Sequence, residues 1–325
     1  MRLIVAQALS KLKRMTRRAI VLGLAALAVG CATPKLTAIT APVVDLRAQP
    51  HTEAQAAAHD PLQETQLLYG ELVRVLKTED GWAQLEAVEQ PEFTHARRWQ
   101  GYPGWVPAAA LSAAGRPWPT TAVVTAPWAE TWQDAYRRQS SPWRFPMGTR
   151  LRAVDMGGQL WHAELLDGGT VWMARDAARS LEELAALPAL DRRRLIVRNA
   201  EQLVGQPYYW GGRSPDGLDC SGLVNLAYRA AGVDIPRDAH EQFLRATPVK
   251  ALQPGDLVFL SERGNPQRIV HVMLYAGNGE LIEGPGTGSA VRRISVGERL
   301  GHPVDWLAPG AAVDGQTVFF GSYLP

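Results

Sequence analysis

Residues 219–228 read Asp-Cys-Ser-Gly-Leu-Val-Asn-Leu-Ala-Tyr, and this stretch decides the fold because it predicts a helix that begins at a cysteine. Gly232 predicts the end of that helix, since glycine tolerates left-handed backbone. Cys220 therefore lies in the first turn, where unpaired N–H groups and the helix dipole favour a thiolate. Apolar side chains recur at the spacing of one helix face, at Leu223, Val224, Ala227 and Ala231.

A second stretch supplies a base for this nucleophile. Residues 271–275 read as a strand, and Gly-Asn-Gly at 277–279 predicts a tight turn into a short returning strand. His271 and Glu283 can then lie side by side on one face, where a carboxylate fixes the tautomer of the imidazole. We predict a catalytic set of Cys220, His271 and Glu283, with His240 as an alternative base that otherwise lines the groove.

The C-terminal part of the chain predicts an α+β domain. Residues 181–203 are rich in Leu, Ala, Glu and Arg at helical spacing, and strands are expected near 256–260, 271–275 and 280–283. Helices followed by an antiparallel sheet pack as two layers, so the cysteine helix is expected to lie on the sheet.

Five short motifs then occur in a fixed order. They are Pro-Tyr-Tyr-Trp-Gly-Gly at 207–212, Asp-Cys-Ser-Gly at 219–222, Ile-Pro-Arg at 235–237 with Gln242, Pro-Gly-Asp-Leu at 254–257 and His-Val at 271–272. Together they resemble the NlpC-type cell-wall peptidases, which are papain-like cysteine hydrolases. The resemblance covers roughly residues 195–290 and implies such a domain over residues 183–325. One departure is Glu283, because the family has His, Asn or Gln most often at that position.

Short strands and turn signals predict two small all-β barrels before this domain. Residues 41–115 resemble bacterial SH3-like domains in their strand–Gly-Glu, Asp-Gly-Trp and Gly-Trp-Val pattern. Residues 116–182 repeat this pattern loosely, with Gly148 matching Gly70, and predict a second SH3-like domain.

The N-terminus reads as an export signal. A basic region without acidic residues precedes the apolar run 19–29, which predicts a signal peptide over residues 1–30. Ala-Val-Gly-Cys at 28–31 resembles a bacterial lipobox, which implies lipidation of Cys31 and a tether over residues 31–40. The resemblance further implies an envelope protein, periplasmic and anchored to the outer membrane. An ordinary signal peptide and a true start at Met15 are the alternatives.

Removing residues 1–30 changes the formal net charge from +2 to −4 because that segment holds six basic residues and no acidic one. The basic balance of the whole chain is therefore an export feature, and no clustered basic face predicts nucleic-acid binding. With Cys31 lipidated, Cys220 has no partner for a disulfide, which favours a functional thiol over an inert buried one.

The resemblance also implies a substrate. Enzymes of this type cut γ-D-glutamyl bonds to a diamino acid in peptidoglycan stem peptides, and the SH3-like arrangement looks like the subgroup that requires a free N-terminal L-Ala. A buried ammonium needs a carboxylate; the candidates are Asp238 and Glu71, with the hydroxyl of Tyr102. A backbone N–H at Cys220 or Ser221 and the hydroxyl of Tyr208 are candidates for the oxyanion site. Asp219 and Ser221 flank the nucleophile and could reach the ligand; Glu71 could equally be a solvated surface residue, and Tyr102 and Tyr208 ordinary core tyrosines.

Two other functions stay open at this point: an endopeptidase on polymeric wall, and a non-catalytic protein that binds wall through SH3-like domains. Intact Cys220 and His271 argue against the second. The seven histidines lack the paired spacing of a zinc site, so no metal or other cofactor is predicted. A monomer is expected.

Overall fold

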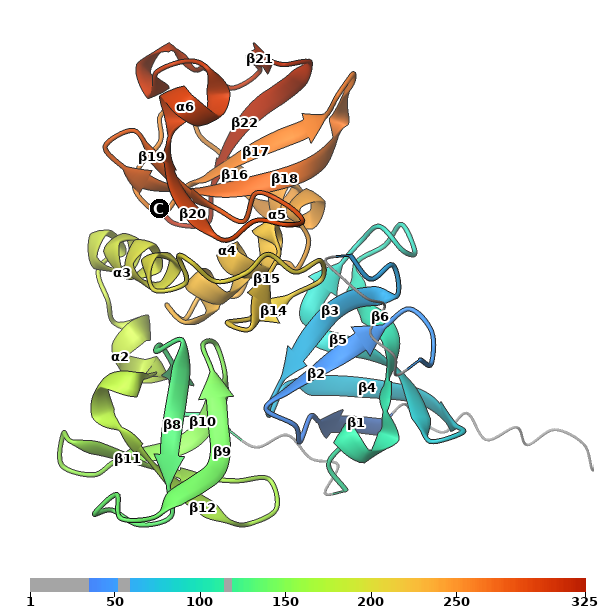
Figure 1. Cartoon of the computed structure of the whole chain (residues 1–325), viewed down its shortest axis with the longest axis vertical. Coiled ribbons are helices and arrows are strands. Elements are labelled where there is room, and N and C mark those ends of the chain that lie inside the picture. The colour runs from blue at the N-terminus through green and yellow to red at the C-terminus, as the bar shows by residue number, and fades with distance from the viewer. Residues whose placement is uncertain (1–34, 52–58, 114–118) are drawn as a thin grey trace, which may run out of the picture. The chain divides into compact units, whose positions relative to one another are not determined.

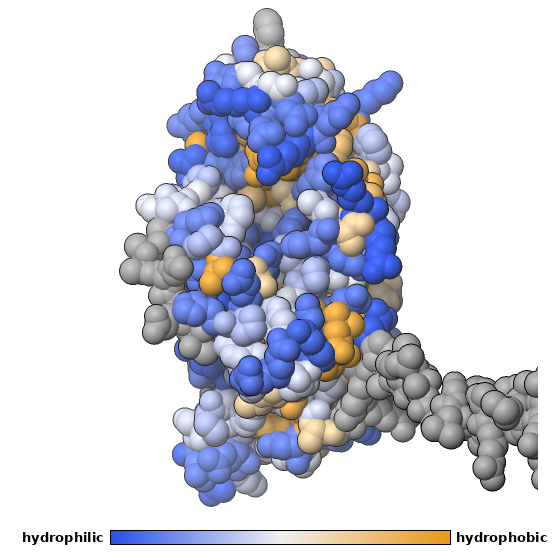
Figure 2. Space-filling view, turned by 90° about the vertical axis from the view of Figure 1, so that its right-hand side faces the viewer, coloured by the Kyte–Doolittle hydropathy of each residue, from blue (hydrophilic) through white to orange (hydrophobic). Residues whose placement is uncertain are grey.

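The computed structural model describes residues 35–51, 59–113 and 119–325 (Figure 1). The predicted signal peptide and Cys31 lie outside these ranges. Within them, no helix is both long and apolar enough to span a membrane. On the face shown in Figure 2 the surface is mostly hydrophilic, and hydrophobic residues form small separate patches.

The first β domain is one antiparallel sheet in the order β1-β4-β5-β6-β2-β3. Its strands close around buried Ile39, Leu67, Val73 and Leu85. Gly70 separates β3 from β4 and takes a φ of 78°, which suits glycine. The elements are β1 (Lys35–Ala38), β2 (Val43–Arg47), β3 (Gln63–Leu68), β4 (Leu72–Glu79), β5 (Trp82–Glu92), β6 (Gln100–Pro107) and the 3-10 turn η1 (Ala108–Ala110).

The predicted tether needs a correction. Residues 31–40 are predicted above as a short tether, yet residues 35–38 form β1 and pair with β4, Lys35 facing Val75 and Ala38 facing Leu72. Ile39, directly after β1, is fully buried. Ala38 and Ile39 are therefore buried within the first β domain, whereas Leu36 is exposed.

The second β domain has a sheet in the order β13-β7-β10-β11-β12-β8-β9. Phe145, Leu151, Trp161 and Met173 fill its core. Gly148 precedes β10 with a φ of 84°, as Gly70 precedes β4. Both domains are all-β, as predicted; their SH3-like character stays a prediction. The elements are β7 (Ala122–Val124), β8 (Trp128–Trp132), β9 (Ser140–Pro146), β10 (Arg150–Asp155), β11 (Leu160–Glu164), β12 (Thr170–Ala174), η2 (Arg175–Ala177) and β13 (Ala178–Ser180).

The C-terminal domain is α+β, as predicted. Its antiparallel sheet has the order β16-β22-β17-β18-β19-β20, and β21 pairs with β22. Helix α4 is buried along its whole length and contacts both α3 and β18, so it forms the centre of the core (Figure 1). The helices are α2 (Leu181–Ala185), α3 (Ala189–Glu201), α4 (Cys220–Arg229), α5 (Ala239–Arg245), α6 (Val296–Leu300) and the turn η3 (Val304–Trp306). The strands are β14 (Arg213–Ser214), β15 (Gly217–Leu218), β16 (Thr247–Pro248), β17 (Leu257–Glu262), β18 (Asn265–Gly277), β19 (Glu280–Glu283), β20 (Arg292–Ser295), β21 (Ala312–Val313) and β22 (Gln316–Ser322).

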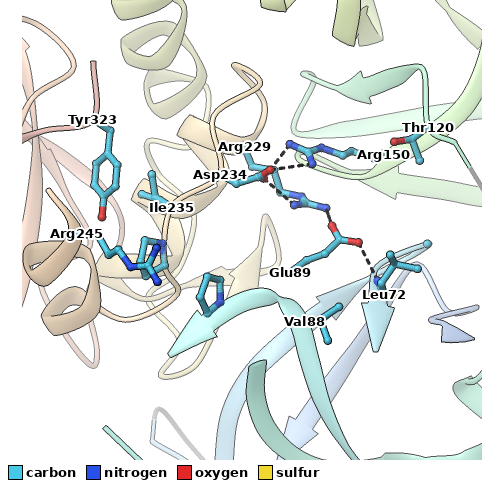
Figure 3. Close-up of a pocket in the computed structure, with 13 residues that line it drawn as sticks. Leu72, Val88, Glu89, Thr120, Arg150, Arg229, Asp234, Ile235, Arg245 and Tyr323 are labelled. Carbon is cyan, nitrogen blue, oxygen red and sulfur yellow. Dashed lines mark hydrogen bonds and ion pairs between the residues drawn. The ribbon is translucent and has the colours of Figure 1, made fainter. Parts of the chain in front are cut away.

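A polar junction joins the three domains (Figure 3). Asp234 of the C-terminal domain accepts hydrogen bonds from Arg150 of the second β domain at 2.8 Å and from Arg229 at 3.0 Å. Arg229 also contacts Glu89 of the first β domain at 2.5 Å, and Glu89 in turn accepts from the N–H of Leu72. These ion pairs line a cavity of about 670 Å³ that contains neither Cys220 nor His271.

Candidate active site

Helix α4 begins at Cys220 because Asp219 caps it. One carboxylate oxygen of Asp219 accepts from the N–H of Gly222 at 2.6 Å, and the other accepts from the N–H of Gly211 at 3.0 Å. A Cβ at Gly222 would collide with the carbonyl oxygen of Gly212, so only glycine fits there. The thiol of Cys220 is 9% exposed and, within the described residues, forms no disulfide.

His271 of β18 lies between Cys220 and Glu283. Its Nε2 is 2.8 Å from Oε2 of Glu283, which leaves Nδ1 for the hydrogen bond to the thiol. Burial alone would lower the pKa of His271, but the charge of Cys220 and the hydrogen bonds to Cys220 and Glu283 raise it to about 9. His271 is therefore an imidazolium at neutral pH, within hydrogen-bonding reach of the Cys220 sulfur.

The hairpin β18–β19 brings the histidine and the glutamate together. Its ladder pairs Leu274 with Ile282, so Glu283 at the end of β19 reaches His271 diagonally on the same face. The alternative base His240 instead accepts a hydrogen bond from the N–H of Ile269 and lines the adjoining pocket.

Glu283 is fully buried and is held by two arginines as well as by His271. Arg292 of β20 donates to Oε1 at 2.7 Å, and Nε of Arg299, on α6, donates to Oε2 at 2.9 Å. Burial opposes ionisation, yet the hydrogen bonds from His271, Arg292 and Arg299 lower the pKa of Glu283 to about 2. The orienting group is therefore a carboxylate at neutral pH.

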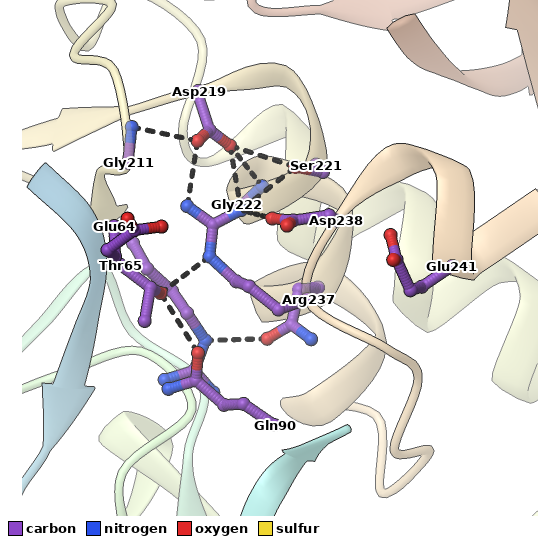
Figure 4. A network of polar contacts seen from close by, with 12 residues as sticks. Glu64, Thr65, Gln90, Gly211, Asp219, Ser221, Gly222, Arg237, Asp238 and Glu241 are labelled. Carbon is purple, nitrogen blue, oxygen red and sulfur yellow. Dashed lines mark hydrogen bonds and ion pairs between the residues drawn. The ribbon is translucent and has the colours of Figure 1, made fainter. Parts of the chain in front are cut away.

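The buried Arg237 binds the two residues on either side of the nucleophile, Asp219 and Ser221 (Figure 4). Arg237 is fully buried and donates to Asp219 at 2.7 Å and to the hydroxyl of Ser221 at 2.8 Å. Its Nε donates to the hydroxyl of Thr65 on β3, and Thr65 also contacts Gln90. Asp219 and Ser221 are two of the predicted ligand contacts. Both line the pocket, but their side chains are hydrogen-bonded to each other and to Arg237.

The pocket over Cys220 has a volume of about 530 Å³ and receives side chains from the first β domain and the C-terminal domain. Tyr208 lines it near the thiol. Burial, together with the charges of Cys220 and Asp219, raises the pKa of Tyr208 above its usual range, so its hydroxyl stays protonated and can donate. Other lining residues include Glu64, His95, Tyr102, Trp210, Asp238, Glu241 and Arg268.

One part of this pocket is acidic. The hydroxyl of Tyr102 lies 2.9 Å from Asp238 and 3.2 Å from Glu64, so a phenol bridges two carboxylates. Burial, with the nearby charges of Glu241 and Asp219, raises the pKa of Asp238 to about 7. On the outer side, hydrogen bonds to Glu64 and Glu92 raise the pKa of His95 to about 9.

Glu64 is a site residue that the sequence reasoning missed, and Glu71 needs a correction. Glu71 was expected to reach the substrate, but its carboxylate is buried 2.7 Å from Arg213 and 3.6 Å from Arg229 and does not line the pocket. Glu64 lies on β3 between two buried neighbours, Gln63 and Thr65, and the alternation of the strand turns it to the other face. The alternation of side chains along this strand is the sequence signal that could have separated Glu64 from its buried neighbours.

A family model described as the NlpC/P60 family matches residues 205–303, the segment that holds α4, β18, β19 and the site built on them. The chain carries an NlpC/P60 domain. This domain confirms the resemblance read from the motifs around Cys220 and His271.

Two curated relatives match a longer part of the chain than the NlpC/P60 family model does. The gamma-D-glutamyl-L-lysine dipeptidyl-peptidase of Bacillus cereus is 29% identical over 231 residues, covering 68% of this chain and 67% of the relative. The gamma-D-glutamyl-L-lysine dipeptidyl-peptidase of Bacillus subtilis is 27% identical over 245 residues, covering 74% of this chain and 78% of the relative. The murein DD-endopeptidase MepH of Escherichia coli is 45% identical over 111 residues, covering 32% of this chain and 41% of the relative.

A solved structure shares the fold. The crystal structure of an NlpC/P60 family protein from Bacillus cereus covers 89% of this chain with a TM-score of 0.71 and 24% identity. The papain-like α+β class of the C-terminal domain is thereby confirmed. Together with the peptidase-named relatives, the NlpC/P60 domain supports a hydrolase of the cysteine-peptidase class.

Proposed function

We propose that this protein is a cysteine peptidase that hydrolyses the bond between γ-D-glutamate and a diamino acid in free peptidoglycan stem peptides. The observation that carries the proposal is the acidic cluster of Glu64, Tyr102 and Asp238, which lines the same pocket as the Cys220 thiol. Two carboxylates and a phenol suit an ammonium group. An unblocked N-terminal L-Ala would supply that ammonium, one dipeptide away from the scissile bond.

The relatives support the same substrate class. Two curated relatives that span most of this chain are named gamma-D-glutamyl-L-lysine dipeptidyl-peptidases, and a dipeptidyl-peptidase releases two residues from a free N-terminus. In this chain, β3 and β6 of the first β domain supply Glu64 and Tyr102. In this proposal the first β domain forms the amine end of the pocket and limits the substrate to two residues before the cleaved bond.

In the proposed mechanism, the Cys220 thiolate attacks the γ-carbonyl carbon of D-glutamate. The oxyanion is bound by a backbone N–H at the start of α4 and by the hydroxyl of Tyr208. The carbon–nitrogen bond breaks, and the His271 imidazolium gives its proton to the leaving amine, which leaves a thioester. His271 then takes a proton from water, the hydroxide attacks the thioester, and the thiolate is regenerated with release of L-Ala-D-Glu.

Mass spectrometry of a digest tests this function. Purified protein is incubated with L-Ala-γ-D-Glu-L-Lys and with the corresponding meso-diaminopimelate peptide, alongside the Cys220→Ala variant. We expect L-Ala-D-Glu and the free diamino acid, and no product from the variant. Cleavage at another bond, or cleavage that survives loss of Cys220, would overturn the proposal. Equal cleavage of N-acetylated peptides would instead favour the wall endopeptidase.

A second part of the proposal concerns location. We propose that Cys31 is lipidated and anchors the protein in the bacterial envelope, on the sequence context of residues 28–31. In a producing bacterium, labelled palmitate should enter the wild-type protein and should not enter Cys31→Ser. Labelling of both would contradict the assignment.

A further inference from the structure

The carboxylate of Glu283 sits among three cationic side chains from three elements. His271 comes from β18, Arg292 from β20 and Arg299 from α6, and each lies within 3.1 Å of a Glu283 oxygen. Arg299 contacts both oxygens, at 2.9 Å and 3.1 Å, so it fixes the plane of the carboxylate. Neither arginine belongs to the motifs that identify the domain.

The local fold places both arginines without strain. Strand β20 pairs with β19 so that Arg292 lies directly opposite Glu283. The next residues enter α6 through a capping box between Ser295 and Glu298, and Arg299 follows in the last turn. Strand β20, at the edge of the sheet, and helix α6, which follows it, therefore place the two arginines beside the carboxylate of Glu283.

The charges explain why two arginines are needed. A buried carboxylate in contact with an imidazolium makes that imidazolium hold its proton more tightly, which makes it a weaker acid toward a leaving amine. Arg292 and Arg299 add two positive charges to the single negative charge of Glu283. The two arginines therefore offset part of the attraction that Glu283 exerts on the proton of His271.

We propose that Arg292 and Arg299 are positioning residues that clamp Glu283 and offset part of its charge, so that the buried carboxylate holds His271 in one orientation without binding its proton too tightly. This inference rests on the proposed function, because it assigns the pair of Cys220 and His271 to catalysis. The charge of Arg299 should act more strongly on Glu283 than that of Arg292 because water screens it less: the side chain of Arg299 is 25% exposed and that of Arg292 is 47% exposed.

Other charged groups around the pair stay constant in the test. Asp219 and Tyr208 face Cys220 from the N-terminal side of α4, and Arg237 pairs with Asp219. His240 on α5 and Arg268 on β18 line the pocket beside His271, and Arg268 pairs with Glu262. Glu298, also on α6, contacts Ser295.

The experiment is the pH profile of Cys220 alkylation by iodoacetamide, which reports the thiolate and requires no substrate. The variants are Arg299→Gln, Arg292→Gln and, as the matched control, Arg293→Gln. Arg293 is the next residue on β20, is similarly exposed at 44%, and pairs with Glu201 and Glu280 rather than Glu283. Arg299→Lys keeps the charge and should rescue the profile.

The charge that each variant removes determines the direction in which the pH profile of Cys220 alkylation shifts. Loss of a positive charge makes the thiolate harder to form and the imidazolium proton harder to remove, so Arg299→Gln should shift both limits of the profile upward by about one pH unit. Arg292→Gln should shift them less, and Arg293→Gln should leave them in place. Glu283→Gln should shift both limits downward, because two arginines are then uncompensated. The triple variant Glu283→Gln, Arg292→Gln, Arg299→Gln should return close to the wild type.

A purely structural role for the arginines predicts another result. Loss of reactivity without a shift, or a triple variant more damaged than each single variant, would overturn the proposal. Parallel assays of tripeptide hydrolysis separate the two claims. Shifted alkylation profiles without tripeptide cleavage would defeat only the proposed substrate, whereas cleavage with unshifted profiles in Arg299→Gln would defeat only the role of the arginines.

Discussion

Nε of Arg237 lies 2.6 Å from the hydroxyl of Thr65, and this bond joins the first β domain to the residue that holds the cap of the nucleophile helix. Arg237 also contacts Asp219 and Ser221, the neighbours of Cys220 on either side. The first β domain therefore does more than line the pocket. It contributes to the geometry of the thiol.

The first prediction tests this link. Thr65→Val removes one hydroxyl and leaves the buried donor of Arg237 and the acceptor of Gln90 unpaired, which costs about 1–3 kcal/mol. We expect kcat on the free tripeptide and the alkylation rate of Cys220 to fall roughly threefold to tenfold, with KM changed less. Thr78→Val, at an exposed position on β4, is the control. A KM effect without a kcat effect would contradict the link.

The second prediction concerns Glu71, whose carboxylate is buried against Arg213 and Arg229. Glu71→Gln leaves the buried guanidinium of Arg213 without its carboxylate partner and should lower the free energy of unfolding by about 3 kcal/mol, while Arg229 keeps its pairs with Glu89 and Asp234. Glu79→Gln, which breaks an exposed pair with Lys77, should change it by less than about 1 kcal/mol. Urea denaturation measures both. A stable Glu71→Gln protein with a raised KM would return Glu71 to the substrate site.

The third prediction is a pH dependence of binding. Because the pKa of Asp238 is raised to about 7, its carboxyl is neutral in mildly acidic solution and charged above pH 7. Affinity for a free peptide amine should therefore increase from pH 6 to about pH 7.5, where an α-amine with a pKa of about 8 is still mostly charged. Calorimetry with the Cys220→Ala variant measures binding without turnover. Asp238→Asn should bind more weakly at pH 7.5 and show a flatter profile; an unchanged slope would exclude Asp238 as the titrating group.

The fourth prediction uses the ion pair of His271 and Glu283. The raised pKa of His271 means that its stabilisation is complete below pH 6.5 and is lost as the pH rises toward 9. The lowered pKa of Glu283 means that its stabilisation is present above pH 4.5 and is lost as the pH falls toward 2. The stability difference between wild type and His271→Gln should thus be larger at pH 6 than at pH 9. An equal difference at both values would contradict the pair.

The sequence predicted the local parts of the site well. The helix starting at Cys220 and the hairpin from His271 to Glu283 depend on apolar spacing, an Asn-Gly turn and a cap, all within a few residues of each other. Such features are written in the sequence because local hydrogen bonds and burial patterns produce them.

The remaining contacts depend on packing between distant segments. Glu64 and Tyr102 meet within the first β domain, and Tyr102 reaches Asp238 only because this domain packs against the start of α5, 136 residues further along the chain. Glu71 was placed wrongly because its burial depends on an ion pair with Arg213, which is 142 residues away along the chain. Arg292 was missed because β20 was not predicted, although its register places it opposite Glu283.

The most direct test of the account compares kcat/KM for L-Ala-γ-D-Glu-L-Lys with kcat/KM for the same peptide acetylated at its N-terminus. An acetylated amine carries no charge to pair with the carboxylates of Glu64 and Asp238 and adds bulk at that end of the pocket, so wild type should prefer the free peptide by at least about 100-fold. Glu64→Gln should lose most of that preference while keeping the alkylation rate of Cys220. Equal rates on both peptides in the wild type would contradict the account and indicate an enzyme that acts on blocked wall peptides.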